Sequence, residues 1–295
     1  MDWVPLFFID DVCHQLRAKS LRLVSELSGS WVRFSSEHCV KRHEFAFNCD
    51  VDWKGGAYCL VKREDRSFTA EVADLDLEYD RITKCDFTII NHPRNSSDTR
   101  RIPVSMDQLQ RDVLPTVASL AMDCSWPYLV PDWERNQLFF KAFQNCPGFN
   151  DIRVYENKEE LRDFVARQVE FGNVETLDLQ TPLTWPPEPE NLVETLKTFV
   201  SSSRFGVLYA CGPMRNDFEL VELFMERALA GELKEGARIR INDISVDTSR
   251  PSTLYPEHRD DDSEEIAWRI PNSNRRIVDL TTLNGVPGTV LLQVV

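Results

Sequence analysis

The first 45 residues carry three short runs of apolar residues at helical spacing. Pro5 opens the first run, as suits the first turn of a helix, and Ser20 can cap the second. The runs contain Ile9, Val12 and Leu16, then Leu21, Val24 and Leu27, then Trp31 and Phe34. Helices this short cannot bury such stripes alone. We therefore expect the apolar run Leu6-Phe7-Phe8 to stay open and to dock another protein.

After residue 43 the period changes from helical to alternating. Apolar side chains at the odd positions from Phe45 to Trp53 alternate with mostly polar ones at the even positions, the period of a half-buried strand. Gly55-Gly56 then turns the chain into residues 57–62. The pattern predicts a β-hairpin.

Six strand cores of the form apolar-x-apolar recur further along the chain. Their first members are 33, 32, 25, 31 and 31 residues apart. The cores are Phe87/Ile89, Leu120/Met122, Ile152/Val154, Leu177/Leu179, Leu208/Ala210 and Ile239/Ile241. Helical stripes lie between them: Leu138, Ala142 and Cys146; Leu161, Phe164 and Val165; Leu192, Leu196, Phe199 and Val200; Leu220, Leu223 and Phe224.

Strands that alternate with helices predict parallel pairing, because each crossover helix returns the chain to the same edge. A nearly constant period favours a curved solenoid over a doubly wound sheet, since each unit then stacks only on its neighbours. The expected fold class is α/β, with a helical segment at 1–45 and a β/α repeat domain at 46–295. Residues 182–189 and the acidic run 260–265 are expected loops. Trp268, Ile270, Ile277, Leu280 and 290–295 are expected to form closing strands.

Composition narrows the choice of partners. The 295 residues carry a formal charge of −14, so no basic excess is present to neutralise nucleic-acid phosphates or an anionic membrane. No segment has the apolar length of a membrane helix, and the amino terminus lacks the basic and apolar regions of a signal peptide. Eight scattered cysteines without a C-x-x-C pair are typical of a reducing compartment. We expect a cytoplasmic or nuclear protein that binds neither nucleic acid nor membrane.

No motif for catalysis or cofactor binding emerges. Phosphate-binding glycine loops, a G-x-S-x-G turn and an H-E-x-x-H helix are all missing from the sequence. The best metal candidate is the set His38, Cys39, His43 and Cys49, whose spacing matches no usual zinc pattern. Cys13-His14, as sequence neighbours on a helix, point in different directions. We therefore expect no catalytic residues, no metal and no cofactor.

The proline-to-tryptophan spacing resembles the F-box without a gap. The family has Leu-Pro, an apolar residue seven positions after the proline and a leucine four positions after that residue. A second leucine follows five positions after the first, an aliphatic residue six positions after the second leucine, and a tryptophan four positions later. These places hold Val4-Pro5, Val12, Leu16, Leu21, Leu27 and Trp31. Val4 departs from the usual leucine, and the acidic residue expected soon after the proline is absent.

The resemblance implies a partner and a surface. F-boxes bind a Skp1-type adaptor and so join a cullin ubiquitin ligase. The implied adaptor-binding residues are Pro5, Leu6, Phe8, Ile9, Val12 and Leu16. The alternative is an ordinary N-terminal helical cap that uses the same apolar spacing for its own core.

The remainder looks like a degenerate leucine-rich repeat, although it lacks the asparagine that usually follows the second strand leucine. The combination also resembles the expanded nematode F-box-like families, chiefly through residues 4–13 and 81–87. That likeness implies a substrate receptor. Residues that flank the apolar strand positions are expected on a concave, partner-binding sheet face: Thr88, Ala121, Asp123, Arg153, Tyr155, Asp178, Gln180, Tyr209, Arg240 and Asn242.

Three hypotheses follow from these observations. In the first, the chain is a substrate-recruiting subunit of a cullin-type ligase, with an unknown target protein and no chemistry of its own. In the second, it is a repeat-based binding module without ligase coupling, which the Val4 departure makes credible. In the third, it is an unrecognised α/β enzyme, which would need a deep pocket that holds a nucleophile and a base.

Overall fold

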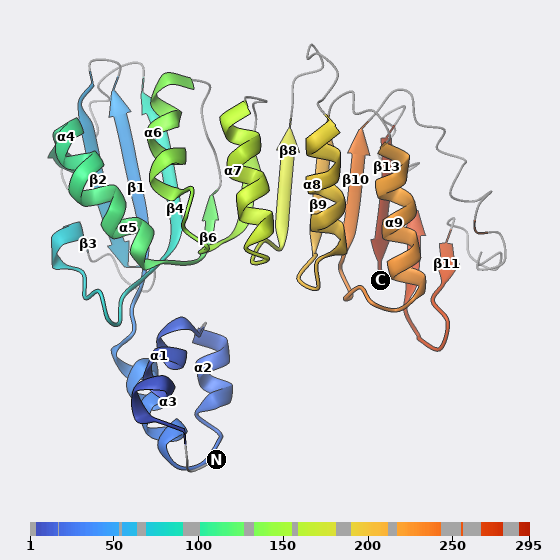
Figure 1. Cartoon of the computed structure of the whole chain (residues 1–295), viewed down its shortest axis with the longest axis horizontal. Coiled ribbons are helices and arrows are strands. Elements are labelled where there is room, and N and C mark those ends of the chain that lie inside the picture. Colours follow the sequence, from blue (N-terminus) through green and yellow to red (C-terminus); the bar gives the residue numbers. More distant parts are fainter. Residues whose placement is uncertain are drawn as a thin grey trace. The chain divides into compact units, whose positions relative to one another are not determined.

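The computed structural model describes residues 4–16, 18–52, 55–63, 69–90, 101–126, 133–154, 159–180, 190–211, 217–242, 255, 267–279 and 289–295. The chain divides into two compact units. Unit 1 comprises residues 1–126 and 134–149, and unit 2 comprises residues 127–133 and 150–295. Each unit combines helices with β-strands, so the fold is α/β, as the sequence predicts (Figure 1).

Unit 1 begins with the three predicted helices. They are α1 (Leu6–Gln15), α2 (Ala18–Val24) and α3 (Ser30–Lys41). Gly29 precedes α3 with a φ of 71°, a left-handed backbone that favours glycine at this turn. Ile9, Cys13 and Leu21 form a small core between the helices. Val4, Leu16, Trp31 and Phe34 pack against that core.

The strands of unit 1 follow the helices. They are β1 (Glu44–Asp52), β2 (Ala57–Arg63), β3 (Thr69–Ala70), β4 (Arg81–Ile90), β5 (Ile102–Val104) and β6 (Ala121–Trp126), with a 3-10 turn, η1 (Val72–Asp74), after β3. Their order is β6-β4-β1-β2-β3, and β5 also pairs with β2. The predicted hairpin is confirmed, because β1 and β2 pair antiparallel, with Cys49 opposite Cys59. Strand β4 runs parallel to β1 and to β6.

A helical stretch before β6 corrects the predicted strand core Leu120/Met122. It comprises α4 (Met106–Gln108), a π-helical turn η2 (Leu109–Val113) and α5 (Leu114–Leu120). Its buried positions Leu109, Val113, Val117 and Leu120 are three or four residues apart, so they share one helix face. Leu120 therefore ends a helix, and the strand begins one residue later.

Helix α6 (Trp133–Phe143) packs on one face of β4 through aromatic rings. The ring centre of Phe87 lies 4.1 Å from that of Phe139 and 5.6 Å from that of Phe143. Trp126 of β6 extends this cluster, 5.4 Å from Phe143. Cys146, expected on the helical stripe, lies beyond the end of α6.

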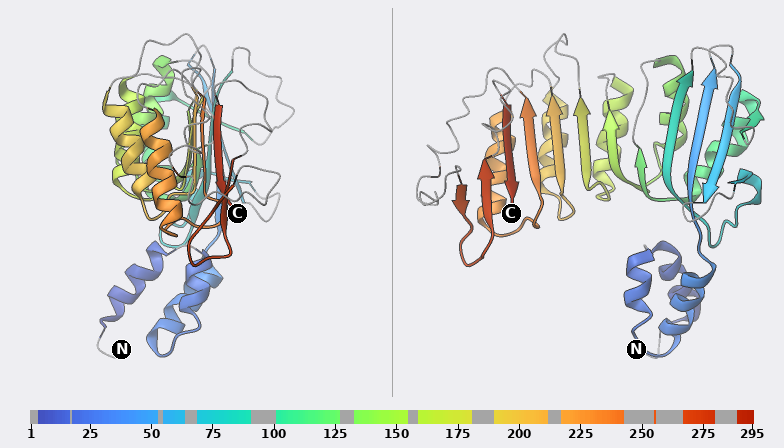
Figure 2. Two further views of the ribbon diagram at one scale, coloured as in Figure 1. Left: turned by 90° about the vertical axis from the view of Figure 1, so that its right-hand side faces the viewer. Right: turned by 180° about the vertical axis from the view of Figure 1, so that it is seen from behind.

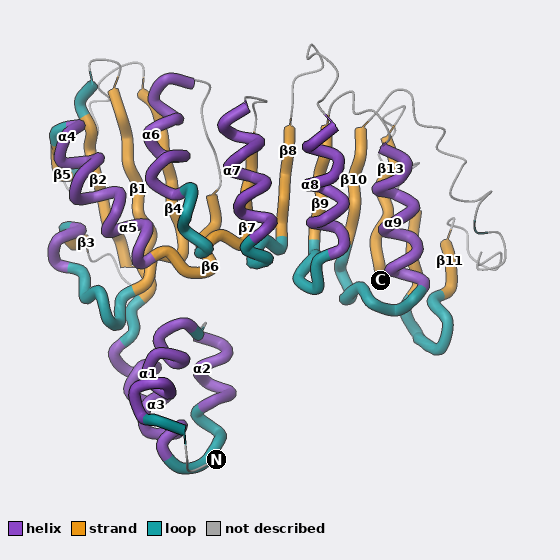
Figure 3. Tube along the Cα trace, in the orientation of Figure 1, coloured by secondary structure: helices purple, strands orange, loops and turns teal. Residues whose placement is uncertain are grey.

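Unit 2 alternates strands with helices, as the repeat pattern predicts. The elements are β7 (Phe149–Val154), α7 (Glu159–Glu170), β8 (Thr176–Gln180), α8 (Glu190–Ser201), β9 (Val207–Cys211), α9 (Asp217–Leu229) and β10 (Arg238–Asn242). Strands β7, β8, β9 and β10 are parallel and lie in chain order. Helices α7, α8 and α9 lie along one face of these strands (Figures 2 and 3).

The predicted strand cores of unit 2 are all buried. Ile152 and Val154, Leu177 and Leu179, Leu208 and Ala210, and Ile239 and Ile241 are each less than 9% exposed. Closing strands follow as β11 (Ala267–Arg269), β12 (Arg276–Asp279) and β13 (Thr289–Val294), which pair antiparallel in the order β10-β13-β12-β11. Leu280 and the expected loops 182–189 and 260–265 lie outside the described residues.

Candidate functional site

The first turn of α1 exposes three consecutive large apolar side chains. Leu6 is 53% exposed, Phe7 71% and Phe8 49%. These three residues are called the α1 surface below. Ile9 and Cys13 are four positions apart and both point into the small helical core with Leu21. The α1 surface points away from that core and is exposed in the part of the chain that the structure describes.

The six residues expected to bind an adaptor differ in their exposure. Pro5, Leu6 and Phe8 are exposed, and Val12 and Leu16 are half-buried. Ile9 is 2% exposed, so its side chain belongs to the helical core and is not available at the surface. Phe7 is not among the six residues that the F-box resemblance implies, although the sequence predicts that the run Leu6-Phe7-Phe8 docks another protein. The exposure of Phe7 could be predicted from the sequence. The residues three and four positions after Phe7 are Asp10 and Asp11, and neither extends an apolar stripe from Phe7.

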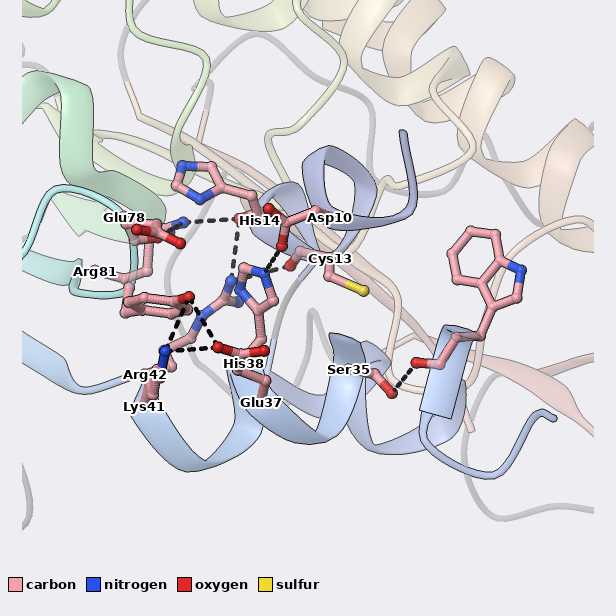
Figure 4. A network of polar contacts seen from close by, with 12 residues as sticks. Asp10, Cys13, His14, Ser35, Glu37, His38, Lys41, Arg42, Glu78 and Arg81 are labelled. Carbon is pink, nitrogen blue, oxygen red and sulfur yellow. Dashed lines mark hydrogen bonds and ion pairs between the residues drawn. The ribbon is translucent and has the colours of Figure 1, made fainter. Parts of the chain in front are cut away.

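Two arginines hold the carboxyl end of α1. Arg42, just after α3, donates to the carbonyl oxygens of Cys13 at 3.0 Å and His14 at 3.1 Å, and also to that of Leu16. Arg81, at the start of β4, donates to the carbonyl oxygens of His14 at 2.9 Å and Glu78 at 3.0 Å (Figure 4). Carbonyl oxygens in the last turn of a helix lack intrahelical donors. Positively charged side chains at this end also interact favourably with the helix dipole.

Burial lowers the pKa values of the basic groups at the end of α1, and for Arg81 and His14 neighbouring positive charge lowers them further. Burial lowers the pKa of Arg81 to about 10, with Arg42 as the next cause. Burial likewise lowers the pKa of Arg42. The pKa of His14 is also lowered, first by burial and then by Arg81, His38 and Arg42. Three cationic or potentially cationic groups therefore share a small volume, in which backbone carbonyls supply the compensating dipoles.

A second set of contacts fixes α1 against α3. The Nε2 atom of the buried His38 lies 2.8 Å from a carboxylate oxygen of Asp10 (Figure 4). The His38 ring lies 5.2 Å from that of Tyr79, and Lys41 sits 4.6 Å over the Tyr79 ring. These contacts link α1 and α3 to the turn that leads into β4. The helix that presents the α1 surface is therefore held in place by side-chain contacts along its length.

The residues weighed as metal ligands or nucleophiles have other neighbours. His38 contacts Asp10, and Nδ1 of His43 lies 3.1 Å from Asp80. The sulfur atoms of Cys49 and Cys59 lie 3.8 Å apart. Over the described ranges, no group of three or more His, Cys, Asp and Glu side chains is placed to hold a metal ion. Burial, followed by Asp10, raises the pKa of the Cys13 thiol, which opposes formation of a thiolate.

The expected partner-binding residues of unit 2 form a row across its parallel strands. Arg153 is opposite Asp178, Asp178 is opposite Tyr209, and Tyr209 is opposite Arg240. Each alternates with buried apolar neighbours along its own strand, so the row lies on the sheet face away from the helices. The guanidinium of Arg238 stacks over the Tyr209 ring at 5.0 Å.

Exposure along this face is uneven. Arg153 is exposed and pairs with Asp151 at 3.0 Å, whereas Tyr209 and Arg240 are half-buried. Asp178 is buried, so its carboxylate is not available to a partner. In unit 1, Thr88 and Asp123 are half-buried, and Asp123 has a φ of 51°. Gln180 and Asn242 end β8 and β10, Ala121 begins β6, and Tyr155 lies outside the described residues.

Comparison with known proteins finds no similar family, protein or structure. No family model matches this chain, no curated protein matches it, and no solved structure matches it. Within the part of the chain that the structure describes, no helix combines the length and the apolar composition needed to cross a bilayer.

Proposed function

We propose that this protein is a substrate-recruiting subunit of a cullin-type ubiquitin ligase, acting without chemistry of its own in the cytoplasm or nucleus. The F-box-like helices bind a Skp1-type adaptor, and the leucine-rich-repeat-like β/α domain binds an unknown target protein. The observation that carries the proposal is the exposed α1 surface, because Leu6, Phe7 and Phe8 face outward on a helix whose inward residues already have a core.

The bracing of α1 supports this role. A docking helix loses less conformational entropy on binding when it is already held in place. Arg42 and Arg81 bind its carboxyl end, and His38 binds Asp10 in its middle. The free amino-terminal turn is the part left for an adaptor.

The arrangement of unit 2 supports a repeat-based receptor. Spatial order equals chain order from β7 to β10, with the intervening helices on one face, as in a solenoid whose units stack on their neighbours. The opposite face carries Tyr209 and Arg240, and tyrosine and arginine are frequent anchors in protein interfaces.

The first test is co-purification of the full chain with a Skp1-type protein. Phe7→Asp and Leu6→Asp place a charge in the proposed interface and are expected to abolish capture. Leu77→Asp is the matched control, since Leu77 is 60% exposed in the turn before β4 and lies outside the α1 surface. Wild-type protein that captures no such adaptor would rule out ligase coupling and leave the simple binding module.

The second test separates the target from the adaptor. Proximity labelling with wild type, Tyr209→Ala and Arg240→Glu should yield proteins that the two sheet variants lose, while the Skp1-type adaptor is retained by all three. Loss of the adaptor together with the target would contradict the assignment of separate surfaces.

A further inference from the structure

A cationic pocket lies in unit 1, distinct from the α1 surface. It has a volume of about 400 Å³, and its walls include Arg22, Arg42, Arg63, His43, Glu44 and Cys39. Helix α2, the end of α3 and strands β1 and β2 all contribute to these walls. Three arginines facing one cavity are unexpected in a chain with a net charge of −14.

Two of the three arginines, Arg22 and Arg42, form no ion pair with a carboxylate in the part of the chain that the structure describes. Among the described residues that line the pocket, Glu44 is the one carboxylate; Glu44 and Arg63 each have an interaction partner, and His43 is held by Asp80. Arg42 directs its hydrogen bonds to the carbonyls of Cys13, His14 and Leu16, which carry no formal charge. Arg22 is exposed and forms no ion pair with any described residue. Arginine is the side chain best suited to bind a phosphate, because its planar donors match the phosphate oxygens.

We propose that this pocket binds a small soluble phosphate monoester. Its volume falls in the range of about 300–1,000 Å³ typical of small-molecule sites, which is more room than a bare phosphate fills. A small anion inside the pocket responds mainly to charges within a Debye length of about 8 Å at physiological salt. An anionic membrane or a nucleic acid would instead meet the whole acidic surface of the protein, which disfavours both as the source of the phosphate.

Binding is tested on the purified full chain by calorimetry with glycerol 3-phosphate, inorganic phosphate and glycerol. We expect glycerol 3-phosphate to bind more tightly than inorganic phosphate, and glycerol to show no binding. Arg22→Ala should weaken binding roughly 10-fold to 100-fold, as expected for loss of hydrogen bonds to a charged group. Lys19→Ala is the matched control, since it removes the same charge from the same helix outside the pocket and should retain wild-type affinity.

A second measurement reports on occupancy without any substitution. Cys39 lines the pocket and is exposed, whereas Cys13, Cys49, Cys59, Cys85, Cys124 and Cys146 are buried. Glycerol 3-phosphate should slow alkylation of Cys39 by iodoacetamide, with the modified residue located by mass spectrometry.

Several outcomes would overturn the proposal. They are no binding by the wild type, an equal loss of affinity in Arg22→Ala and Lys19→Ala, unchanged alkylation of Cys39 at saturating ligand, or binding only to vesicles that contain phosphatidic acid. The measurements need no adaptor protein, so their failure is independent of any failure in ligase coupling.

Discussion

Arg42 and Arg81 donate hydrogen bonds to the same atom, the carbonyl oxygen of His14, at 3.1 and 2.9 Å. One arginine follows α3 and the other begins β4, so residues 39 positions apart in sequence meet at the end of α1. A carbonyl oxygen has two lone pairs and can accept both bonds. The sharing ties the orientation of α1 to the start of a buried strand, and it makes each arginine important for stability.

Replacement of Arg81 should therefore destabilise the fold. Arg81→Met removes the donors to the carbonyls of Glu78 and Asp80 and one of the two donors to the carbonyl of His14. We expect a loss of about 2–3 kcal/mol in the free energy of unfolding, measured by urea denaturation. Arg153→Met, which removes an exposed arginine, should cost less than about 1 kcal/mol. Equal losses in the two variants would contradict a structural role for the shared carbonyl.

Stability should also fall on acidification through His14. Its folded-state pKa is lowered, chiefly by burial and by Arg81, so the unfolded chain binds a proton at His14 more readily than the folded chain does. The free energy of unfolding then decreases as the pH falls below the ordinary histidine pKa of about 6.5. His14→Gln removes this titration. The drop in urea midpoint between pH 7.5 and pH 5.5 should be smaller in His14→Gln than in the wild type, and an identical drop would contradict the prediction.

The α1 surface and the helical core should respond differently to truncation. Leu21 is fully buried, so Leu21→Ala should cost about 2–5 kcal/mol through lost burial and a cavity. Phe7→Ala removes a larger side chain, but one that is mostly exposed, and should change the free energy of unfolding by no more than about 0.5 kcal/mol. A large loss in Phe7→Ala would mean that Phe7 serves the fold and not a partner.

Periodicity predicted much of the architecture. The three helices of residues 1–45, the β1–β2 hairpin and the alternation from β7 to β10 each repeat one spacing over enough residues to identify the element. The helix before β6 was missed because Leu120 and Met122 also fit the apolar-x-apolar spacing of a strand, although Leu109, Val113, Val117 and Leu120 keep a helical spacing. Ser105, whose side chain accepts from the backbone N–H of Gln108, was an available start signal.

The bracing of α1 could not be predicted in the same way. Arg42 and Arg81 bind backbone carbonyls, and a carbonyl is present at every position whatever the side chain. Sequence patterns therefore give no complementary residue that would reveal the contact. The exposure of single residues is also hard to predict from the sequence. Phe8 and Ile9 are adjacent apolar residues, and the packing of α2 and α3 decides which of them is buried.

Gly148 offers a last prediction, because a side chain there would meet the backbone. A Cβ at this position would lie 2.2 Å from the carbonyl oxygen of Ala121 and 2.6 Å from its carbonyl carbon. The chain cannot simply move away, since the carbonyl of Gly148 accepts a hydrogen bond from the backbone N–H of Cys124 at 2.7 Å. We expect Gly148→Ala to cost more than about 2 kcal/mol, as a substitution that forces a backbone shift next to β6.

Gly172→Ala is the appropriate comparison for Gly148→Ala. Gly172 has a φ of 71° with open space around its Cβ position, so alanine there meets only the left-handed backbone penalty of about 1 kcal/mol. Thermal and urea unfolding of the two variants should therefore rank Gly148→Ala as the less stable. The reverse order would mean that Ala121 and Gly148 are not in close contact, and that the start of β6 is packed differently from the arrangement described above.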